Sequence, residues 1–264
     1  MKQIIITGGD GFIGKRVCER LKQNKDYNLI ILKEEEFDIR KPESFENLTC
    51  DYFIHMAALI RNEHPQKMMD VNVKGTFNVL EFCKRVGAKL IFTSSCGVYG
   101  NSHSPIKEDS PLAPVNYNGL TKLLGEQLCN YYLINHNVCS IILRIFNPYG
   151  PGQREGFLIA DIIKQLKNGK IILKNPYPKR DYVHIDDVAE AIEKSLQVNI
   201  SEIFNIGTGI GTSVKELVKM ITDKPVIFEN ETLIEDDIHA DISKAEISLN
   251  WKPKIQLNEG LQRI

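Results

Sequence analysis

Three glycines near the start of the chain, Gly8, Gly11 and Gly14, have the spacing of a phosphate-binding loop. They follow the apolar run Ile4-Ile5-Ile6, which predicts a buried strand, and they open an amphipathic stretch from Phe12 to Leu21 that predicts a helix. Gly8 permits a tight turn, Gly11 lets the backbone approach a pyrophosphate, and Gly14 lets the helix pack closely on the strand. The helix N-terminus adds N–H donors and a positive dipole end, so the segment predicts a dinucleotide-binding site.

The elements that must position this loop alternate along the first part of the chain. Strand-like runs occur at residues 3–6, 28–32, 52–57, 89–94 and 138–145, and helical patterns lie between them at 12–24, 42–48, 65–85 and 119–135. Pro42 and Pro65 suit first-turn positions, and Gly87 suits a helix C-terminus. This alternation predicts an α/β fold built on a doubly wound parallel (Rossmann) sheet.

The pattern loosens after Arg144, where the turn-rich segment 147–152 begins. We expect residues 1–146 to form a dinucleotide-binding domain. Residues 147–264 are expected to form mainly a small C-terminal α/β substrate-binding subdomain, with some segments returning to the first domain. Ligands of open α/β sheets bind at the carboxyl ends of the strands, so the later residues are expected to pack over those ends.

Composition excludes several classes of partner. The chain has 33 basic and 34 acidic residues and no basic run, which argues against nucleic acid and against an anionic membrane surface. The six cysteines form no C-x-x-C pair and the six histidines show no ligand spacing beside them, so we expect reduced thiols and no metal. The start of the chain leaves no room for a signal peptide and Arg144 interrupts the longest apolar run, which predicts a cytoplasmic protein.

Further motifs, in a fixed order, accompany the glycine loop. With them the chain is similar, over nearly its whole length, to the extended short-chain dehydrogenases/reductases of the nucleotide-sugar epimerase and dehydratase family. The resemblance implies NAD as cofactor (with NADP possible), a nucleotide-sugar substrate and a homodimer, although family membership alone does not fix the reaction. The motifs are His55-Met56-Ala57-Ala58, Asn72-Val73-Lys74-Gly75-Thr76, Thr93-Ser94-Ser95-Cys96-Gly97-Val98-Tyr99-Gly100, Arg144-Ile145-Phe146-Asn147-Pro148-Tyr149-Gly150, Arg180-Asp181-Tyr182-Val183-His184 and Asp241-Ile242-Ser243-Lys244-Ala245.

The resemblance also implies the catalytic positions. The family uses a serine or threonine after a central strand, then a tyrosine four residues before a lysine, and the tyrosine is its acid/base. Ser95 and Lys122 match the outer members, but Asn118 stands where the family places the tyrosine. An amide cannot accept or return a proton. Tyr117 is adjacent and would become the phenol if the alignment were shifted by one residue, although on a helix that shift means about 100° of rotation.

Cofactor and substrate positions follow from the same resemblance. The adenosine ribose is expected near Lys33, which favours the 2'-phosphate of NADP, or near Glu34, which favours the free hydroxyl of NAD; NAD is the expected cofactor, and a solvated turn is the alternative for this charge run. Asn147 and Arg180 match positions that contact a nucleotide diphosphate, and Ser95 would hold the sugar. The remaining expected cofactor-binding residues are Gly8, Gly11, Phe12, Ile13, Gly14, Asp38, Ile39, Ala57, Ala58, Asn72, Thr93, Lys122 and Phe146.

The type of reaction is narrowed by two departures from the family pattern. Dehydratases of the family carry an Asp-Glu pair directly after the catalytic residue, whereas this chain has Cys96 and Gly97, which favours an epimerase or 4-keto reductase over a 4,6-dehydratase. The family's second phosphate-binding arginine is missing, and residues 231–237 form an acidic run that would repel a diphosphate. Two functions remain, an NAD(P)-dependent sugar epimerase or reductase and a dinucleotide-binding protein without turnover.

Overall fold

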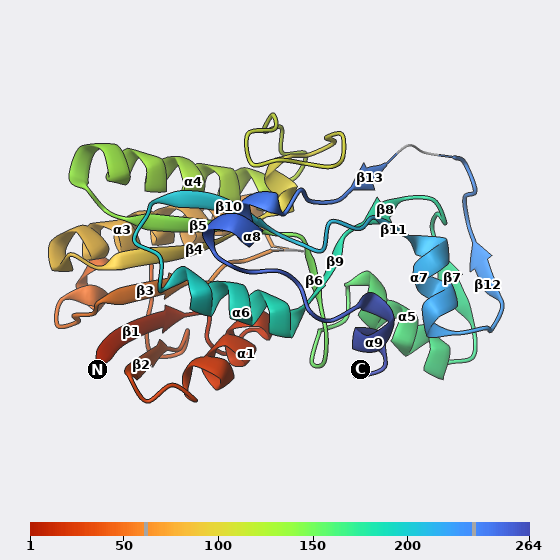
Figure 1. Ribbon diagram of the computed structural model, residues 1–264, viewed down its shortest axis with the longest axis horizontal. Coiled ribbons are helices and arrows are strands. Elements are labelled where there is room, and N and C mark those ends of the chain that lie inside the picture. The colour runs from red at the N-terminus through yellow and green to blue at the C-terminus, as the bar shows by residue number, and fades with distance from the viewer. Residues whose placement is uncertain (61–62, 234–235) are drawn as a thin grey trace.

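The computed structural model describes residues 1–60, 63–233 and 236–264. Within them, the central feature is a six-stranded sheet in which every neighbouring pair is parallel, in the order β10-β5-β4-β3-β1-β2 (Figure 1). The doubly wound parallel sheet is thus confirmed. Its strands are β1 (Lys2–Thr7), β2 (Tyr27–Leu32), β3 (Tyr52–His55), β4 (Lys89–Ser95), β5 (Ser140–Ile145) and β10 (Glu202–Ile206).

Helices cover both faces of this sheet. Helices α1 (Phe12–Leu21) and α6 (Ile185–Ser195) lie on one face, and α3 (Gly75–Val86) and α4 (Tyr117–His136) lie on the other (Figure 1). Side chains alternate along a strand, and β1 accordingly sends Ile4 and Ile6 into the core beneath α1 and α6, and Ile5 into the core beneath α3. A strand buried on both faces is apolar at every position, which is the pattern seen in the sequence.

The strand order reverses between β1 and β3, because β2 follows β1 on one side and β3 returns on the other. The crevice of a doubly wound sheet lies at such a reversal, outside the carboxyl ends of the strands. Between β2 and β3 the predicted helix over 42–48 is wrong in type and length, since only a 3₁₀ turn, η1 (Pro42–Phe45), forms. Phe45 is 2% exposed and packs on Phe53 and Phe82, which anchors the connection before Asp51 enters the sheet.

The predicted helix over 65–85 is present but not uniform. It consists of α2 (Pro65–Met68), a π-helical segment η2 (Met69–Lys74) and α3, and it ends at Gly87, whose φ of 72° is left-handed as a glycine cap requires. A π segment widens the turn locally, and Asn72 within it is 3% exposed. This distortion positions a buried amide beside the carboxyl ends of the strands.

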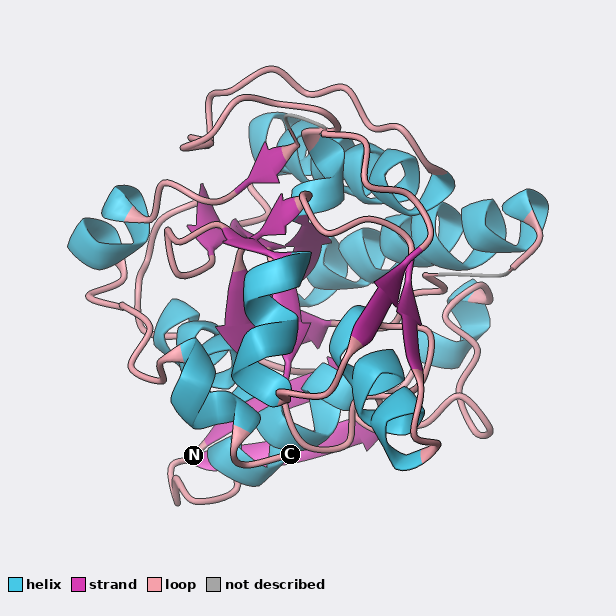
Figure 2. Cartoon of the chain, turned by 90° about the vertical axis from the view of Figure 1, so that its right-hand side faces the viewer, coloured by secondary structure: helices cyan, strands magenta, loops and turns pink. Residues whose placement is uncertain are grey.

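The second lobe, on the right of Figure 1, consists of short strands and helices. Its buried apolar side chains form a separate core. Viewed from that lobe, the strands lie among layers of helices (Figure 2). The chain returns to the large sheet twice, first through α6 and β10 and, after β13, through α8 (Ser243–Ser248). Trp251 is buried there at 1% exposure. The elements of the lobe are β6 (Asn147–Tyr149), α5 (Leu158–Lys167), β7 (Ile171–Leu173), β8 (Lys179–Arg180), β9 (Tyr182–His184), β11 (Thr212–Ser213), α7 (Val214–Ile221), β12 (Val226–Phe228), β13 (Asp237–Ile238) and α9 (Leu257–Leu261).

Helices α3 and α4 also carry exposed apolar side chains, which bear on the expected homodimer. Tyr132 on α4 is not among them, because it is 2% exposed and donates its hydroxyl to Glu81. The exposed large apolar residues of the two helices are Phe77, Tyr117, Leu120, Tyr131 and Ile134. Among the described residues, no helix combines the length and the apolar character needed to cross a bilayer, and no His, Cys, Asp or Glu cluster could hold a metal ion.

Candidate active site

The centre of the candidate site is the end of β4, where residues 93–97 meet the start of α4. A side chain at Gly119 would place its Cβ 2.2 Å from the carbonyl oxygen of Gly97, so the two backbones touch. Asn116 begins the helix by accepting a hydrogen bond from the Gly119 N–H at 2.9 Å. The Ser95 hydroxyl accepts one from the Gly97 N–H at 3.1 Å. These contacts hold the first turn of α4 against the segment that carries Ser95.

Asn118 is the second residue of α4, next to the Gly97–Gly119 contact. Its side-chain oxygen Oδ1 is buried and has no hydrogen-bond partner among the described residues. Leaving a buried amide oxygen unpaired is unfavourable, so this atom is a candidate acceptor for a hydrogen bond from a bound molecule or water. The amide can donate and accept hydrogen bonds but cannot carry a proton between partners.

Lys122 lies one turn further along α4, on the same helical face as Asn118. Its side chain is only 6% exposed, and Nζ donates a hydrogen bond of 2.6 Å to the carbonyl oxygen of Thr93. Burial lowers the pKa of Lys122 to about 8. Ser95, Asn118 and Lys122, three of the expected catalytic positions, are therefore brought to the end of one strand.

Tyr117, the alternative catalytic phenol, has a different setting. It is the first residue of α4 and its side chain is 52% exposed. Asn118 points its buried oxygen inward from the next position, and one residue along a helix is about 100° of rotation. For Tyr117 to act on a ligand beside Ser95, its ring would have to turn in from the surface.

The glycine loop is closely packed at Gly8 and Gly14 and open beside Gly11. A Cβ at Gly14 would lie 1.9 Å from the carbonyl oxygen of Gly8, and one at Gly8, where φ is +70°, would lie 2.7 Å from the Ala57 nitrogen. A Cβ at Gly11 would meet only that Gly8 oxygen, at 3.2 Å, so the remaining space beside Gly11 is open. Helix α1, which starts with Phe12 and Ile13 directly after Gly11, has no side-chain cap, so no side chain among the described residues satisfies its N-terminal donors.

The expected adenosine end of the site lies at the turn after β2. Lys33 accepts backbone hydrogen bonds from the N–H groups of Glu36 and Phe37, so Lys33 and Glu34 sit in an exposed turn. Asp38 accepts two side-chain hydrogen bonds of 2.8 Å from Arg40, which hold the pKa of its carboxyl at about 2. Next to it is a cavity of about 300 Å³ lined by Asp38, Arg40, Lys41, Asp70 and Lys74.

Several residues that were expected to bind the cofactor make hydrogen bonds or packing contacts within the protein, around the candidate site. Asn72 bonds both backbone groups of Leu59 at 2.8 Å and the Thr121 hydroxyl at 2.9 Å, which ties the loop after β3 to α4. The Thr93 hydroxyl donates to the His55 carbonyl. Ala57 and Ala58 belong to the loop after β3 and are partly exposed. Ile39 is 8% exposed and packs against Gly75.

Phe146 was expected beside the cofactor, and the structure buries its side chain completely. Its ring packs near that of Tyr99, with centroids 6.3 Å apart, in a core beneath residues 238–242. Only the backbone of Phe146 reaches the strand end, where its N–H donates to the Ile206 carbonyl. An apolar residue directly after a buried strand is as consistent with core packing as with ligand contact.

The spacing of the motifs did not predict a buried polar network that begins at the residue before Ser95. Glu126 accepts hydrogen bonds from the Ser94 hydroxyl and from Arg144, whose Nη2 lies 2.7 Å from its Oε2, and both charged side chains are 2% exposed. Arg144 also donates to the Tyr99 hydroxyl at 2.8 Å. The signal in the sequence was an arginine inside the apolar strand 140–145, because a buried guanidinium requires a carboxylate partner.

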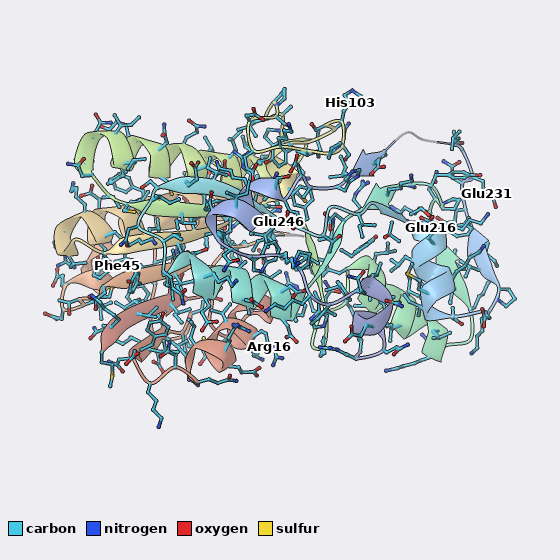
Figure 3. All side chains as sticks on the ribbon, viewed as in Figure 1. Arg16, Phe45, His103, Glu216, Glu231 and Glu246 are labelled. Carbon is cyan, nitrogen blue, oxygen red and sulfur yellow. The ribbon has the colours of Figure 1, made fainter. Side chains whose placement is uncertain are left out.

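Two of the expected substrate residues lie in short strands of the second lobe, Asn147 at the start of β6 and Arg180 at the end of β8. Asn147 donates to the Asp181 carbonyl at 3.0 Å. Arg180 forms an ion pair with Asp236, with Nη2 2.7 Å from Oδ2, so this guanidinium is already neutralised by the acidic segment. Glu231 is exposed on the second lobe (Figure 3), and residues 234 and 235 of the acidic run lie outside the described residues.

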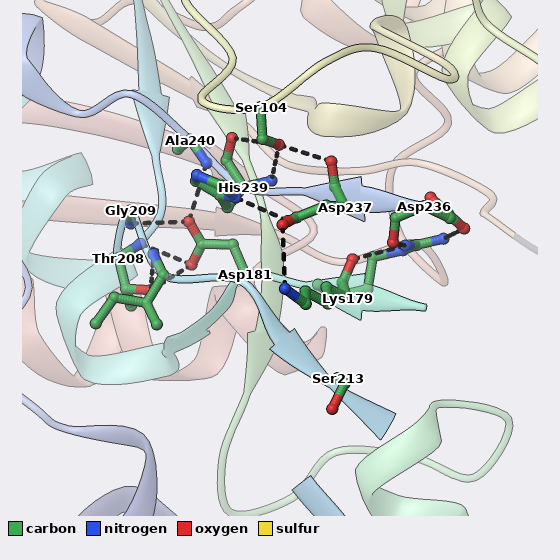
Figure 4. A network of polar contacts seen from close by, with 12 residues as sticks. Ser104, Lys179, Asp181, Thr208, Gly209, Ser213, Asp236, Asp237, His239 and Ala240 are labelled. Atoms are coloured by element: carbon green, nitrogen blue, oxygen red, sulfur yellow. Dashed lines mark hydrogen bonds and ion pairs between the residues drawn. The ribbon is translucent and has the colours of Figure 1, made fainter. Parts of the chain in front are cut away.

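Asp181 joins the segments around Arg180 (Figure 4). It is fully buried, and its carboxylate accepts hydrogen bonds from the backbone N–H groups of Thr208, Gly209 and Ala240 and from the Thr208 hydroxyl. Burial raises the pKa of this carboxyl even though those donors act in the opposite direction. Asp181 therefore fixes the neighbouring Arg180 relative to the segment that carries Asp236.

The model of the NAD dependent epimerase/dehydratase family matches residues 4–207. A putative UDP-glucose 4-epimerase of Methanocaldococcus jannaschii is 37% identical, with 99% of this chain and 96% of the relative covered. Two crystal structures share the fold: UDP-glucose 4-epimerase of Thermotoga maritima with UDP-glucose (TM-score 0.88, 29% identity, 98% and 96% covered), and UDP-glucuronic acid 4-epimerase of Bacillus cereus with NAD (TM-score 0.89, 28% identity, 99% and 96% covered).

Other relatives bear the names of UDP-glucuronic acid decarboxylases and of a dTDP-4-dehydro-6-deoxyglucose reductase, so the relatives share nucleotide-sugar chemistry rather than one reaction. The family match covers the glycine loop, the end of β4 and the first turns of α4, which are the parts that form the candidate site. The chain belongs to the NAD-dependent epimerase/dehydratase family.

Proposed function

We propose that the protein is an NAD(P)-dependent nucleotide-sugar epimerase or 4-keto reductase in which Asn118 replaces the phenol of the family. The observation that carries this proposal is the meeting of Ser95, Asn118 and Lys122 at the end of β4, with a buried, unpaired oxygen on Asn118. Such an atom in the middle of a site is a place for a substrate hydroxyl.

The dinucleotide would lie across the carboxyl ends of β1 and β3. The backbone around Gly11 and the start of α1 would hold its pyrophosphate, and Lys122 would contact the nicotinamide ribose. The nicotinamide, when bound, supplies a hydride acceptor or donor. NAD is the expected form because Glu34 and Asp38 bring negative charge to the adenosine end, although Lys33 and Arg40 leave room for NADP.

The residues at the end of β4 then have distinct tasks. The Ser95 hydroxyl and the Asn118 amide would hold the reacting oxygen of the sugar, and Lys122 would set the local potential. Cys96 and Gly97 follow Ser95 and supply no additional carboxyl groups, so elimination of water is disfavoured. Hydride transfer at one sugar carbon needs no further proton carrier of that kind.

The substrate end imposes a condition on nucleotide diphosphates. Arg180 is the cation expected there, and its partner Asp236 would have to be displaced before a phosphate could bind. If a phosphate took the place of Asp236, Arg180 would again make one charge-assisted hydrogen bond, but its hydrogen bond to the carboxylate would be lost. We therefore expect weak binding of the nucleotide part compared with a site whose arginine has no carboxylate partner.

The alternative function is a dinucleotide-binding protein without turnover, and the specific observation in its favour is that no phenol stands at Asn118. Single-turnover absorbance of NADH at 340 nm with UDP-, GDP- and dTDP-sugars separates the two functions. We expect Asn118→Tyr to react 10²- to 10⁴-fold faster than the unaltered chain, which is about 3–5 kcal/mol of barrier.

Tyr117→Phe is the matched control for this comparison. If the unaltered chain is fully active and Tyr117→Phe abolishes the activity, then Tyr117 is the phenol and Asn118 is not its replacement. If Asn118→Tyr binds the dinucleotide in calorimetry but remains inert with every sugar, the protein is a binding protein and the enzymatic proposal fails.

A further inference from the structure

Lys122 has unused hydrogen-bonding capacity at the place where the site lacks a phenol. An ammonium carries three N–H donors, and among the described residues Nζ of Lys122 donates one hydrogen bond, to the Thr93 carbonyl oxygen. The aromatic ring of Phe92 lies under the same cation, with its centroid 5.0 Å from Nζ. Because the side chain is 94% buried, its other donors are removed from bulk water and are available to a ligand.

Asn118, one turn before Lys122 on α4, carries a hydrogen-bond acceptor that has no partner among the described residues. Residues four apart on a helix are neighbours on one face, so the buried oxygen of Asn118 and the ammonium of Lys122 project from adjacent turns of α4. One face of α4 thus carries an acceptor without a partner and, one turn further on, an ammonium that makes one hydrogen bond among the described residues. A hydroxyl group, or one water molecule bound to it, satisfies both because oxygen accepts and donates at once.

We propose that Lys122 itself transfers the proton in this site, an assignment that rests on the proposed function. In the oxidation direction, one water bound between Asn118 Oδ1 and Lys122 gives a proton to the neutral amine of Lys122 and takes the hydroxyl proton of the sugar. The carbon–hydrogen bond breaks at the same time, and its electron pair leaves as a hydride to the oxidised nicotinamide. The products are the ketone, the ammonium and the reduced nicotinamide, and the reverse step returns the proton to oxygen.

The charged and titratable groups around Lys122 favour this role. On β3, His55 is fully enclosed, and burial together with the charge of Lys122 lowers its pKa to about 3, so it stays neutral. On α4, burial raises the pKa of Cys129 to about 12, and Glu126 is paired with Arg144. After β4, burial raises the pKa of Cys96 to about 11. Lys122, with a pKa of about 8, is the group of this set that changes charge near neutral pH.

The decisive substitution is Lys122→Arg, made in the unaltered chain and in Asn118→Tyr. Arginine keeps the positive charge and the donors but does not release a proton at working pH. We expect Lys122→Arg alone to lose at least about 100-fold in single-turnover rate while calorimetry shows dinucleotide affinity changed by less than about tenfold. In the Asn118→Tyr background the same substitution should cost a clearly smaller factor in rate, because the phenol then carries the proton and only the other tasks of Lys122 are disturbed.

A second experiment removes the amine of Lys122 instead of replacing it with the larger guanidinium group. Lys122→Ala should recover turnover on addition of ethylamine, which a purely structural lysine would not require. The matched control is Lys89→Met: Lys89 is also buried and bonds the Ser195 carbonyl, but it lies at the opposite end of β4. We expect Lys89→Met to keep the pH profile of the unaltered chain and to show no response to the amine.

A third readout is independent of turnover. The ¹³Cε and ¹⁵Nζ chemical shifts of Lys122 in the dinucleotide-free protein should titrate with a midpoint of about 8. A midpoint near the ordinary lysine pKa of about 10.4 would overturn the assignment, as would equal losses from Lys122→Arg in both backgrounds. Absence of turnover in every variant, Asn118→Tyr included, would instead refute the proposed enzymatic function and the role of Lys122 with it.

Discussion

Arg180 and Asp236 form an ion pair at the junction of the lobes, with Nη2 and Oδ2 2.7 Å apart and both side chains about one-third exposed. The Asp236 carboxylate is therefore already paired with the Arg180 guanidinium, which is the cation that a substrate phosphate would need. We predict that Asp236→Asn binds UDP and UDP-glucose about tenfold more tightly, since a hydrogen bond to a charged group contributes about 1.5–3 kcal/mol and part of it is lost to screening.

Asp237→Asn is the control for that measurement, because Asp237 pairs with His239 and Lys179 rather than with Arg180. Calorimetry of both variants against UDP decides the matter. Equal affinities for Asp236→Asn and the unaltered chain would show that Arg180 does not contact the nucleotide.

Two glycines of the loop are predicted to respond differently to a side chain. A Cβ at Gly11 meets only the Gly8 oxygen, at 3.2 Å, and points into open space, so Gly11→Val should abolish NAD(H) binding with a nearly unchanged Tm. A Cβ at Gly14 would lie 1.9 Å from the same oxygen, so Gly14→Ala should lower Tm as well. Calorimetry and thermal unfolding separate the effects; retention of NAD binding by Gly11→Val would remove the glycine loop from the site.

The pair of Arg144 and Glu126 is predicted to be sensitive to removal of one partner. Both side chains are 2% exposed, and leaving one buried charge alone costs about 3–5 kcal/mol. Arg144→Met should lower the free energy of unfolding by about that amount, and Arg144→Met with Glu126→Leu should lower it less. Urea denaturation measures both. A double variant less stable than the single one would mean that the pair is strongly stabilising.

His55 is predicted to contribute to acid sensitivity. It is held neutral between the hydroxyls of Thr7 and Thr76, at 2.7 and 3.0 Å, and its pKa falls from 6.5 to about 3. The unfolded chain therefore binds a proton that the folded chain refuses between these values, and stability is complete above pH 6.5 and declines as the pH falls. His55→Gln should flatten the dependence of the unfolding free energy on pH by up to about 1.4 kcal/mol per pH unit near pH 5. An unchanged slope would contradict the burial of a neutral imidazole.

Much of the first lobe could be predicted from the sequence because its signals are local. The apolar runs that became β1, β3, β4 and β5 pack into the cores on both faces of the sheet, and the run of the edge strand β2 is partly buried. Gly87 caps α3 with the left-handed backbone that only its type adopts readily. Asn118 and Lys122 share a helical face because of their spacing alone. Each of these features depends on residues within one turn or one strand.

The rest depended on partners that are distant in the chain. Residues 202–206 became a strand of the large sheet because they pair with β5, and nothing in their own pattern selects that neighbour over another. The segment 42–48, expected as a helix, forms only a 3₁₀ turn, and its Phe45 packs against the distant rings of Phe53 and Phe82. The pairing of Arg180 with Asp236 likewise requires two segments to meet, and the acidic run predicted only that a phosphate would be opposed.

The position of β10 at the edge of the sheet has a consequence for how the chain reaches its fold. During synthesis, β5 leaves the ribosome well before β10, and the whole of β6 to β9 must be made in between. Until then β5 is an exposed apolar edge, and the face that α6 will cover is bare. A fragment ending at residue 146 would keep both defects permanently, so we expect it to aggregate, whereas adding residues 147–206 should restore a soluble product.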